Sequence, residues 1–281
     1  MKLNTIYAEN FKIDGGACFG VVPKTIWGKF TSPDENNLLE ICLRSLLIED
    51  GNRLILIDAG IGDKQSEKFY SYQYITGRDN LQKSFNKAGY KFEDVTDVIF
   101  THLHYDHCGG AVIRNKKYKF ELLFKNAMHW CSKAQWNMTL NPNVINKASY
   151  YEENIVPIKE MNRLMLIEDD FVFTENVRLK IFNGHTEGQL IPFVHYKGKI
   201  LVFVSDFIPS AAHIPLPYIA AFDNQPLVTL KEKENFYLEA LKFNFTLFFE
   251  HDAYNECCTL KMTDKGIKFD KIFPLSAFTN E

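Results

Sequence analysis

The chain of 281 residues is 46% hydrophobic and 24% charged, values typical of a globular protein with a sizeable core. This composition excludes disordered, collagen-like and coiled-coil proteins. With 32 basic against 35 acidic residues, the chain has no excess of positive charge to neutralise phosphates, so we expect no nucleic-acid partner.

We also expect that the chain neither spans a membrane nor is located in an oxidising compartment. No apolar run approaches the roughly 18 residues that a transmembrane helix needs, and the first residues lack the apolar core of a signal peptide. The six cysteines form no Cys-x-x-Cys pair, which favours reduced thiols and a cytoplasmic location. Since no repeat or linker divides the sequence, we expect a single domain over 1–281.

Short runs rich in β-branched and aromatic residues predict strands, and stretches between them predict helices. The predicted strands, in chain order, cover 38–48, 53–58, 98–101, 177–182, 189–195, 200–206 and 245–250. The first two should pair as a hairpin around Asp50-Gly51-Asn52. Helices are predicted at 80–88 and at 229–241, the second with Thr229 as its N-cap. Residues 141–163 show no clean period, so we expect a surface insertion or loop with some helix.

Three histidines and an aspartate fall within six residues, in the pattern His102-x-His104-x-Asp106-His107. The block follows a predicted strand, in which residues two apart point the same way, so His102 and His104 can converge on one metal ion. The turn that follows can bring Asp106 and His107 to a second ion. Packing gives no reason for such a cluster, because each buried polar group without a partner costs about 1–3 kcal/mol. Imidazole with carboxylate suits zinc, and also iron or manganese.

This motif resembles the signature of the metallo-β-lactamase superfamily of hydrolases. The resemblance implies three further ligands, each at the end of a strand, and the chain has His185, Asp206 and His251 at such places in that order. The implied ligand set is His102, His104 and His185 for one ion, Asp106, His107 and His251 for the other, and Asp206 as the bridge between them.

The resemblance also implies the fold, an α+β αββα sandwich in which two mixed β-sheets pack face to face with helices on both outer faces. Asp58 ends a predicted strand, and in this superfamily an aspartate so placed orients a ligand histidine. A turn-capping role for Asp58 is the alternative.

Segments outside the ligands are similar to the quorum-quenching N-acyl-homoserine lactonase and methyl parathion hydrolase-like branch. These are residues 14–24, Trp27 and 205–223, and the similarity is weakest at 141–163. The chain departs from the family at two positions. Gln189 stands where the superfamily commonly has a second histidine, which is not a ligand, and Pro209 stands where some small lactonases place a catalytic tyrosine.

The activity that the resemblance implies is hydrolysis of a small molecule. Two divalent ions, zinc or else iron, manganese or cobalt, would share a water and lower its pKa from about 16 toward about 7. The resulting metal-bridging hydroxide would open a lactone, such as one of the N-acyl-homoserine class, or cleave an ester. The catalytic residues would be Asp206, which bridges the ions, and Asp106, which would assist proton transfer to the leaving group.

The loop after Asp206 is expected to line the substrate pocket. Residues 208–222 contain three prolines and many apolar side chains, which suits a stiff cover for an acyl chain or aryl group. The pocket residues that we expect are Phe19, Trp27, His213, Tyr218 and Phe222. Ordinary core packing is the alternative for about half of the apolar residues concerned.

Two other activities stay open at this point. The same hydroxide would serve a phosphotriesterase, and iron persulfide dioxygenases keep this motif but use a single iron. Metal analysis with oxygen consumption distinguishes a dioxygenase from a hydrolase. Flavodiiron enzymes are disfavoured, because they usually carry glutamate at the position of His104 and need a flavin domain. Analogy with the branch suggests a homodimer.

Overall fold

The structure, a computed structural model, describes residues 1–280. The strands are β1 (Lys2–Asp14), β2 (Leu38–Asp50), β3 (Arg53–Ile57), β4 (Asp97–Ile99), β5 (Val112–Arg114), β6 (Phe120–Leu122), β7 (Met128–Ser132), β8 (Leu164–Ile167), β9 (Phe171–Val172), β10 (Val177–Phe182), β11 (Gln189–Tyr196), β12 (Lys199–Phe203), β13 (Thr246–Phe248), β14 (Cys257–Thr263) and β15 (Gly266–Phe273). The α-helices are α1 (Gly15–Phe19), α2 (Lys24–Trp27), α3 (Glu67–Gln73), α4 (Asn80–Ala88), α5 (Tyr105–Cys108), α6 (Lys133–Leu140), α7 (Val156–Glu160), α8 (Pro226–Phe243) and α9 (Leu275–Asn280).

Both large sheets are mixed, as the predicted α+β class requires. Among residues 1–280, one sheet has the strand order β1-β2-β3-β4-β7-β8 and another has the order β15-β14-β13-β12-β11-β10-β9. In the first sheet, β2 and β3 form the predicted antiparallel hairpin, with Asp50 opposite Arg53, and β3, β4, β7 and β8 pair in parallel. In the second, β12 and β13 are parallel, while the β11–β12, β13–β14 and β14–β15 pairs are antiparallel.

Residue contacts divide the chain into two compact units whose segments alternate along the sequence. The first unit consists of Met1–Asn10, Leu43–Phe171 and Gly188–Leu190, and the second of Phe11–Cys42, Val172–Glu187 and the described part of Ile191–Glu281. The single domain expected over 1–281 stays a prediction. Among the residues that the structure describes, no helix combines the length and the apolar character needed to cross a membrane.

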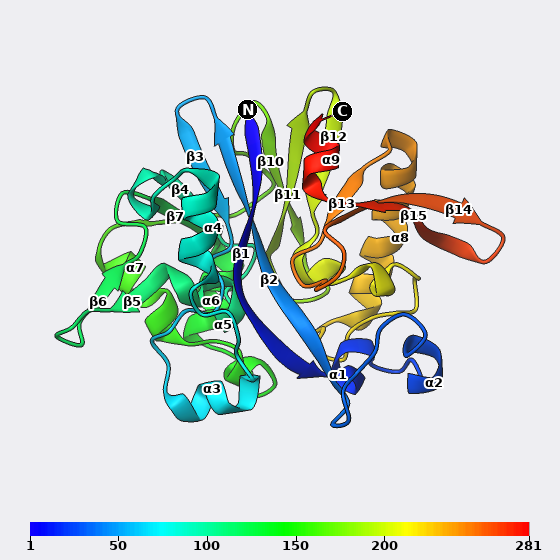
Figure 1. Ribbon diagram of the computed structural model, residues 1–281, viewed down its shortest axis with the longest axis horizontal. Coiled ribbons are helices and arrows are strands. Elements are labelled where there is room, and N and C mark those ends of the chain that lie inside the picture. The colour runs from blue at the N-terminus through cyan, green and yellow to red at the C-terminus, as the bar shows by residue number, and fades with distance from the viewer. Residues whose placement is uncertain (281) are drawn as a thin grey trace. The chain divides into compact units, whose positions relative to one another are not determined.

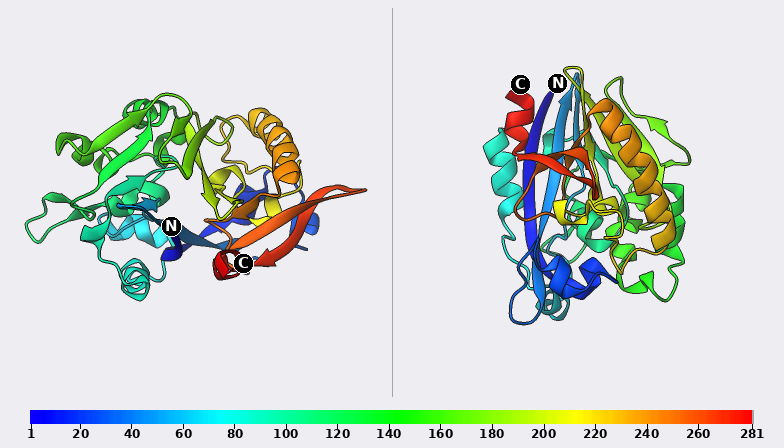
Figure 2. Two further views of the ribbon diagram at one scale, coloured as in Figure 1. Left: turned by 90° about the horizontal axis from the view of Figure 1, so that it is seen from above. Right: turned by 90° about the vertical axis from the view of Figure 1, so that its right-hand side faces the viewer.

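The core of the second unit lies between its sheet and helix α8. Phe236, Tyr237 and Ala240 of α8 are almost fully buried in one cluster with side chains of β11, β12 and β13. Figure 2 shows the long helix running beside these strands. Each large apolar side chain buried in this way contributes about 1.5–3 kcal/mol to folding. The cluster therefore fixes α8, whose polar face then meets the loops described below.

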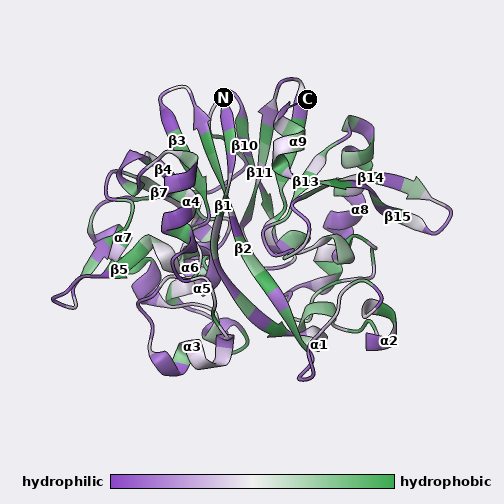
Figure 3. Ribbon diagram, viewed as in Figure 1, coloured by the Kyte–Doolittle hydropathy of each residue, from purple (hydrophilic) through white to green (hydrophobic). Residues whose placement is uncertain are grey.

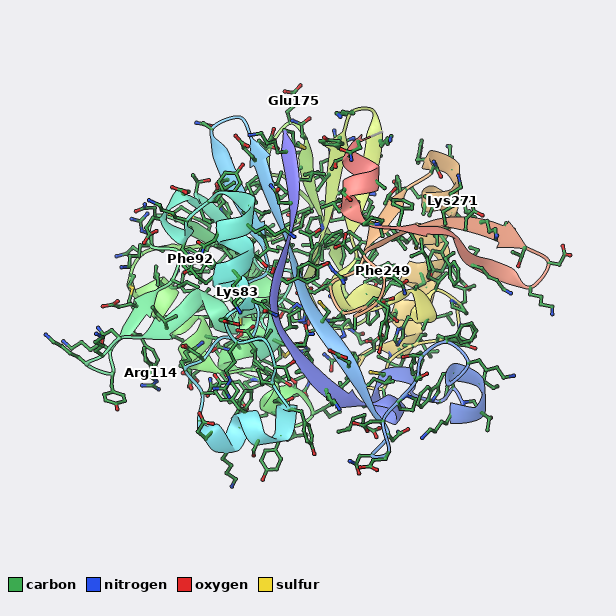
Figure 4. The ribbon with its side chains drawn as sticks, viewed as in Figure 1. Lys83, Phe92, Arg114, Glu175, Phe249 and Lys271 are labelled. Atoms are coloured by element: carbon green, nitrogen blue, oxygen red, sulfur yellow. The ribbon has the colours of Figure 1, made fainter. Side chains whose placement is uncertain are left out.

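Polarity along the ribbon follows the burial of each element. In Figure 3 the middle of β11 is hydrophobic, while α4 of the other unit is largely hydrophilic. The β14–β15 hairpin runs outward from the seven-stranded sheet (Figure 1). Figure 4 shows Lys271 on this hairpin pointing outward, whereas Phe249, which follows β13, is fully buried.

Several predicted boundaries need correction. The predicted strands 98–101, 200–206 and 245–250 end early, at Ile99, Phe203 and Phe248. In each case one apolar residue follows the strand, and the next residue is polar, lies outside the sheet and has a side-chain partner of its own; these polar residues are Thr101, Ser205 and Glu250. The predicted strands and helices occur in the predicted order among further elements that were not predicted, and the candidate ligands lie beyond the strand ends.

The predicted N-cap of the long helix is also wrong. Helix α8 begins at Pro226 with Gln225 as its N-cap, because proline has the backbone angle of a first helical residue and needs no N–H there. Thr229 lies one turn into the helix. Residues 141–163 contain α7 and two short 3-10 turns, as expected of a loop with some helix, but they are only partly a surface insertion, since Ile155 and Ile158 are fully buried.

Candidate metal centre

In the first unit, the histidine block lies in the loop after β4 and in the short helix α5. His102 and His104 stand beyond the last strand residue, Ile99, so the strand-like alternation predicted for them is wrong. Their rings still meet, with Nε2 of His102 at 3.0 Å from Nδ1 of His104. Asp106 and His107 follow in α5, and His107 Nε2 is 3.5 Å from the Asp106 carboxylate. All four residues are at most 9% exposed, so polar donors are concentrated in a place with little access to water.

Asp58 connects this loop to the end of β3. One oxygen of its carboxylate accepts a hydrogen bond from the main-chain N–H of Thr101 at 2.8 Å, and the other accepts from the Thr101 hydroxyl at 2.6 Å. The second oxygen also lies 3.2 Å from Nδ1 of His107. A histidine held at Nδ1 presents Nε2 to a metal ion, so this is the contact that an orienting aspartate makes.

Two glycines after α5 allow the loop to lie directly against the chain that follows β3. A Cβ atom on Gly109 would overlap the carbonyl oxygen of Ile61, and one on Gly110 would overlap that of Ala59. The buried ammonium of Lys64 donates a hydrogen bond to the Gly109 carbonyl, and burial lowers the pKa of Lys64 to about 8. Close backbone approach therefore explains both glycines.

In the second unit, Asp206 lies between two histidines that follow the ends of other strands. Its Oδ2 is 3.1 Å from Nε2 of His185, and its Oδ1 is 2.5 Å from Nε2 of His251. The three side chains are at most 6% exposed. Each oxygen of one carboxylate thus faces a different imidazole, an arrangement that suits a carboxylate shared between two cations.

The other ring nitrogen of each histidine has its own partner. His251 Nδ1 is 3.0 Å from the carbonyl oxygen of Cys42, and His185 Nδ1 is 2.9 Å from Oδ1 of Asp223. The second oxygen of Asp223 accepts a hydrogen bond from the Thr229 hydroxyl of α8 at 2.8 Å. Sequence analysis gave Asp223 no role. The only signal was a carboxylate just before a predicted helix, which indicates a helix cap equally well.

Two residues beside these groups have strained backbones. Asp58 has a φ of 58° and Ser205, which precedes Asp206, has a φ of 43°. Residues other than glycine rarely adopt this left-handed region, and they keep it only where the surrounding structure compensates for the cost. The Ser205 hydroxyl donates to Glu250 at 3.2 Å, which helps to hold this turn. Such strain is concentrated at functional sites.

The residues predicted to line a substrate pocket gather in one aromatic cluster of the second unit. Phe19 stacks on Trp27 at 5.0 Å and on His213 at 4.5 Å, between ring centroids, and Tyr218 meets the edge of Phe19 at 6.3 Å. Phe222 contacts the His185 ring edge-on at 5.7 Å. Phe19, Trp27 and His213 are at most 4% exposed, so these three are core residues of the cluster.

The half-buried members of the cluster are Tyr218 and Phe222, and these are the ones with surface left for a ligand. Burial lowers the pKa of His213 to about 4, so its imidazole is neutral at pH 7. His213 lies between the Ser210 hydroxyl at 2.7 Å and the Cys18 carbonyl oxygen at 2.9 Å. His213 therefore connects α1 to the loop that follows Asp206, and its role is structural.

The two departures from the family pattern lie in different units. Gln189 is buried at the start of β11 in the first unit, and neither atom of its side-chain amide has a hydrogen-bond partner within residues 1–280. Pro209 lies in the second unit, in the loop after Asp206, where it provides no hydroxyl group. No base or acid is available at that position.

The donors of both units suit a divalent metal ion. His102, His104, Asp106 and His107 of the first unit are candidate ligands, as are His185, Asp206 and His251 of the second. Nitrogen from imidazole with oxygen from carboxylate is the donor set of zinc and of other first-row metals. Cys108 does not belong to the set, and its thiol instead donates to the carbonyl oxygens of Leu103 at 3.5 Å and His104 at 3.3 Å.

Comparison with known sequences finds a family whose matched region contains the donors of the first unit. The family model of the metallo-beta-lactamase superfamily matches residues 44–118, all of them in the first unit. An N-acyl homoserine lactonase from Bacillus thuringiensis is 22% identical over 240 residues, covering 78% of this chain and 84% of that protein.

Solved structures share the fold. A probable metal-dependent hydrolase from Staphylococcus aureus is 27% identical, with a TM-score of 0.89, and covers 97% of this chain and 96% of its own. AidC, a dizinc quorum-quenching lactonase solved in complex with its product N-hexnoyl-L-homoserine, is 21% identical with a TM-score of 0.75. That likeness covers 98% of this chain and 97% of the AidC chain.

Proposed function

The chain belongs to the metallo-beta-lactamase superfamily, and on this premise we propose that it is a dinuclear metal-dependent hydrolase that opens lactones or cleaves esters. This family membership confirms the predicted family and fold class. The relatives of the chain are hydrolases of that superfamily, which supports metal-dependent hydrolysis as its activity. The number of metal ions and the choice of substrate are the proposed part.

We propose that these candidate ligands hold two divalent ions. The ligands are His102, His104 and His185 for one ion, Asp106, His107 and His251 for the other, and Asp206 for both. The observation that carries this proposal is the placement of His185 and His251 on different oxygens of Asp206. A carboxylate with one function would need only one such partner.

When bound, such a pair of ions polarises the oxygen of the scissile group and lowers the pKa of water from about 16 to about 7. The residues of the chain supply orientation. Asp58 and Asp223 each hold Nδ1 of a histidine and so present Nε2 of that ring. Asp106, which retains some exposure, is proposed to pass a proton to the leaving oxygen. An Asp106→Asn variant that kept both its metals and its turnover would remove this role.

The substrate that we propose is a small lactone or ester with an apolar substituent, N-acyl-homoserine lactones being the first to test. Tyr218 and Phe222, with Phe19, Trp27 and His213 packed behind them, would form an aromatic wall of the pocket. The relatives named as N-acyl homoserine lactonases support this choice. Zinc as the metal is supported by the donor set and by the dizinc neighbour. A cytoplasmic location and a homodimer remain proposals.

The experiment is a substrate panel with the metal-loaded enzyme and a chelated sample as control. Lactones of different acyl length, aryl esters and phosphotriesters would be compared by kcat/KM, with oxygen uptake recorded in parallel. Hydrolysis of lactones or esters that disappears on chelation is the expected result. A higher kcat/KM for phosphotriesters would replace lactones and esters by phosphotriesters as the proposed substrate class. Oxygen uptake with a persulfide substrate, and no hydrolysis, would replace the function by that of an iron dioxygenase.

A further inference from the structure

The loop between Asp206 and Asp223 is irregular over most of its length, and its backbone depends on outside partners. It spans residues 208–222 of the second unit and includes one short 3-10 turn, Ala211–His213. A few of its amides bond within the loop or to α1, as Tyr218 N–H does to Pro215 and Ala221 N–H does to Ala17. Its carbonyl groups need donors, because buried main-chain oxygens without a partner are costly.

Helix α8 supplies those donors from two side chains one turn apart. The Lys233 ammonium donates to the carbonyl oxygens of His213 at 2.7 Å, Pro215 at 3.1 Å and Tyr218 at 3.0 Å. The hydroxyl of Tyr237 donates to the carbonyl oxygen of Ile214 at 2.6 Å. Four carbonyl groups of one loop are thus held by one helix face.

The lysine is unusual in its surroundings. Lys233 is 1% exposed, and its three hydrogen-bond acceptors match the three donors of an ammonium group. Burial lowers its pKa to about 7. Burying an ammonium is expensive, so its presence indicates that the position of these carbonyls matters. An apolar residue would fill the same space at less cost to desolvation but would leave these three carbonyl groups without their donor.

The same helix also holds the neighbourhood of a candidate metal ligand. Glu232 accepts from the main-chain N–H groups of Asn183 at 2.7 Å and Gly184 at 3.0 Å, just before His185. Thr229 holds Asp223 at the far end of the loop. The face of α8 that carries Thr229, Glu232, Lys233 and Tyr237 therefore places both the aromatic wall and the His185 turn. Of these four, Lys233 and Tyr237 direct their polar groups to the loop alone.

We propose that Lys233, assisted by Tyr237, is the positioning residue that fixes the 208–222 loop and thereby sets which acyl or aryl group the enzyme accepts. This inference rests on the proposed hydrolase function, since the loop carries Tyr218 and Phe222 of the proposed pocket wall. Lys233 does not touch the reacting atoms. Its effect is on substrate binding through the loop, so it should appear in KM and in the substrate preference before it appears in kcat.

The test uses Lys233→Met, which keeps an unbranched apolar stem but removes the ammonium group with its three donors, and Tyr237→Phe, which removes one hydroxyl. Lys231→Met on the same helix is the matched control, because Lys231 is largely exposed and pairs with Glu234. Hydrogen exchange of the loop amides, such as those of Tyr218 and Ala221, is measured first. We expect about tenfold faster exchange in Lys233→Met and a smaller increase in Tyr237→Phe, with the β11–β12 amides unchanged.

Kinetics on lactones of short and long acyl chains follow. In Lys233→Met we expect KM for long-chain lactones to rise about tenfold, while kcat stays within about threefold of the wild-type value. Unchanged loop exchange in both variants would overturn the proposal, as would a loss of kcat that is equal for every substrate at unchanged KM. If the wild type hydrolysed none of the substrates, the proposed function would fall, and the exchange measurement alone would decide the positioning role.

Discussion

At the scale of the residue, three aspartates of this molecule each contact two other side chains. Asp206 contacts His185 and His251, Asp58 contacts Thr101 and His107, and Asp223 contacts His185 and Thr229. In Asp58 and Asp223 one partner is a ring nitrogen and the other a hydroxyl, so each carboxylate fixes the angle of an imidazole relative to its backbone. Orientation of this kind contributes to metal affinity.

The aspartate that sequence analysis missed gives the first prediction. Asp223→Ala removes the partner of His185 Nδ1, so we expect metal affinity to fall about 10- to 100-fold. The measurement is titration of the metal-free protein with zinc against a competing chelator. Asp264→Ala, at an exposed position in the turn between β14 and β15, is the control and should bind zinc as the wild type does. Wild-type affinity in Asp223→Ala would show that the contact does not orient a ligand.

A histidine that is not a candidate ligand gives the second prediction. Burial lowers the pKa of His129, in β7, to about 4 from the ordinary 6.5. Between these two pH values the unfolded chain binds a proton that the folded chain does not, so the free energy of unfolding falls as the pH is lowered from 6.5 to 4. His129→Phe should remove this contribution, on the order of 1–3 kcal/mol at pH 4 relative to pH 7.

The check on His129 is urea unfolding of the wild type and the variant at several pH values. Phenylalanine suits the site because His129 already stacks on Phe100, at 5.9 Å between ring centroids. His195→Phe, an exposed histidine of β11, is the matched control. Parallel pH profiles for wild type and His129→Phe would show that the buried ring does not resist protonation.

At the scale of the element, helix α8 has two tasks. Its apolar side holds the seven-stranded sheet, and its polar side holds two loops through Thr229, Glu232, Lys233 and Tyr237. A pattern of apolar residues predicts the first task, because helical periodicity reports burial. It does not predict the second, since a buried lysine looks in sequence like any exposed one.

The close fit between α8 and the His185 turn leads to the third prediction. A Cβ atom on Gly184 would lie 2.5 Å from Cα and N of Thr229, which are backbone atoms and cannot rotate away. Gly184→Ala should therefore lower the free energy of unfolding by about 1–3 kcal/mol. Gly16→Ala is the control, because its nearest neighbour, the Asp14 carboxylate at 2.8 Å, belongs to an exposed side chain that can move. Chemical unfolding compares them, and equal stability of all three proteins would contradict this packing.

How much of the structure follows from sequence differs between elements. Helix α4 has its predicted bounds, and β10 likewise, because a regular pattern and a glycine or polar residue define their ends. Strands β1 and β14 were not predicted. β1 is long, and its buried, half-buried and exposed side chains alternate too irregularly for a period of two to stand out. The edge hairpin β14–β15 is largely exposed, so its sequence carries little apolar signal.

In the candidate site, too, sequence predicts the residues that form a local motif and misses those whose roles depend on tertiary contacts. His102, His104, Asp106 and His107 were predicted from their spacing alone, which is dense enough to be specific. The remaining ligands were implied by a family resemblance, since His185 and His251 stand singly in the sequence. Asp223 and Lys233 were not found, because their roles depend on tertiary contacts with no local pattern.

At the scale of the whole molecule, the proposed chemistry depends on donors that the chain delivers in two sets. One set is compact in sequence and lies in the first unit, and the other is spread over three strand ends of the second. Metal that binds only the folded chain should raise the free energy of unfolding, by about 4 kcal/mol at a free metal concentration a thousandfold above Kd.

The most direct measurement of this claim is the metal content of the purified protein and of its His185→Ala and His107→Ala variants after dialysis. The account predicts about two equivalents of divalent metal, zinc in the first instance, per chain of wild type. It predicts a loss of metal in either variant, although the two histidines belong to different units. A single iron in the wild type, or a full metal content in His185→Ala, would contradict it.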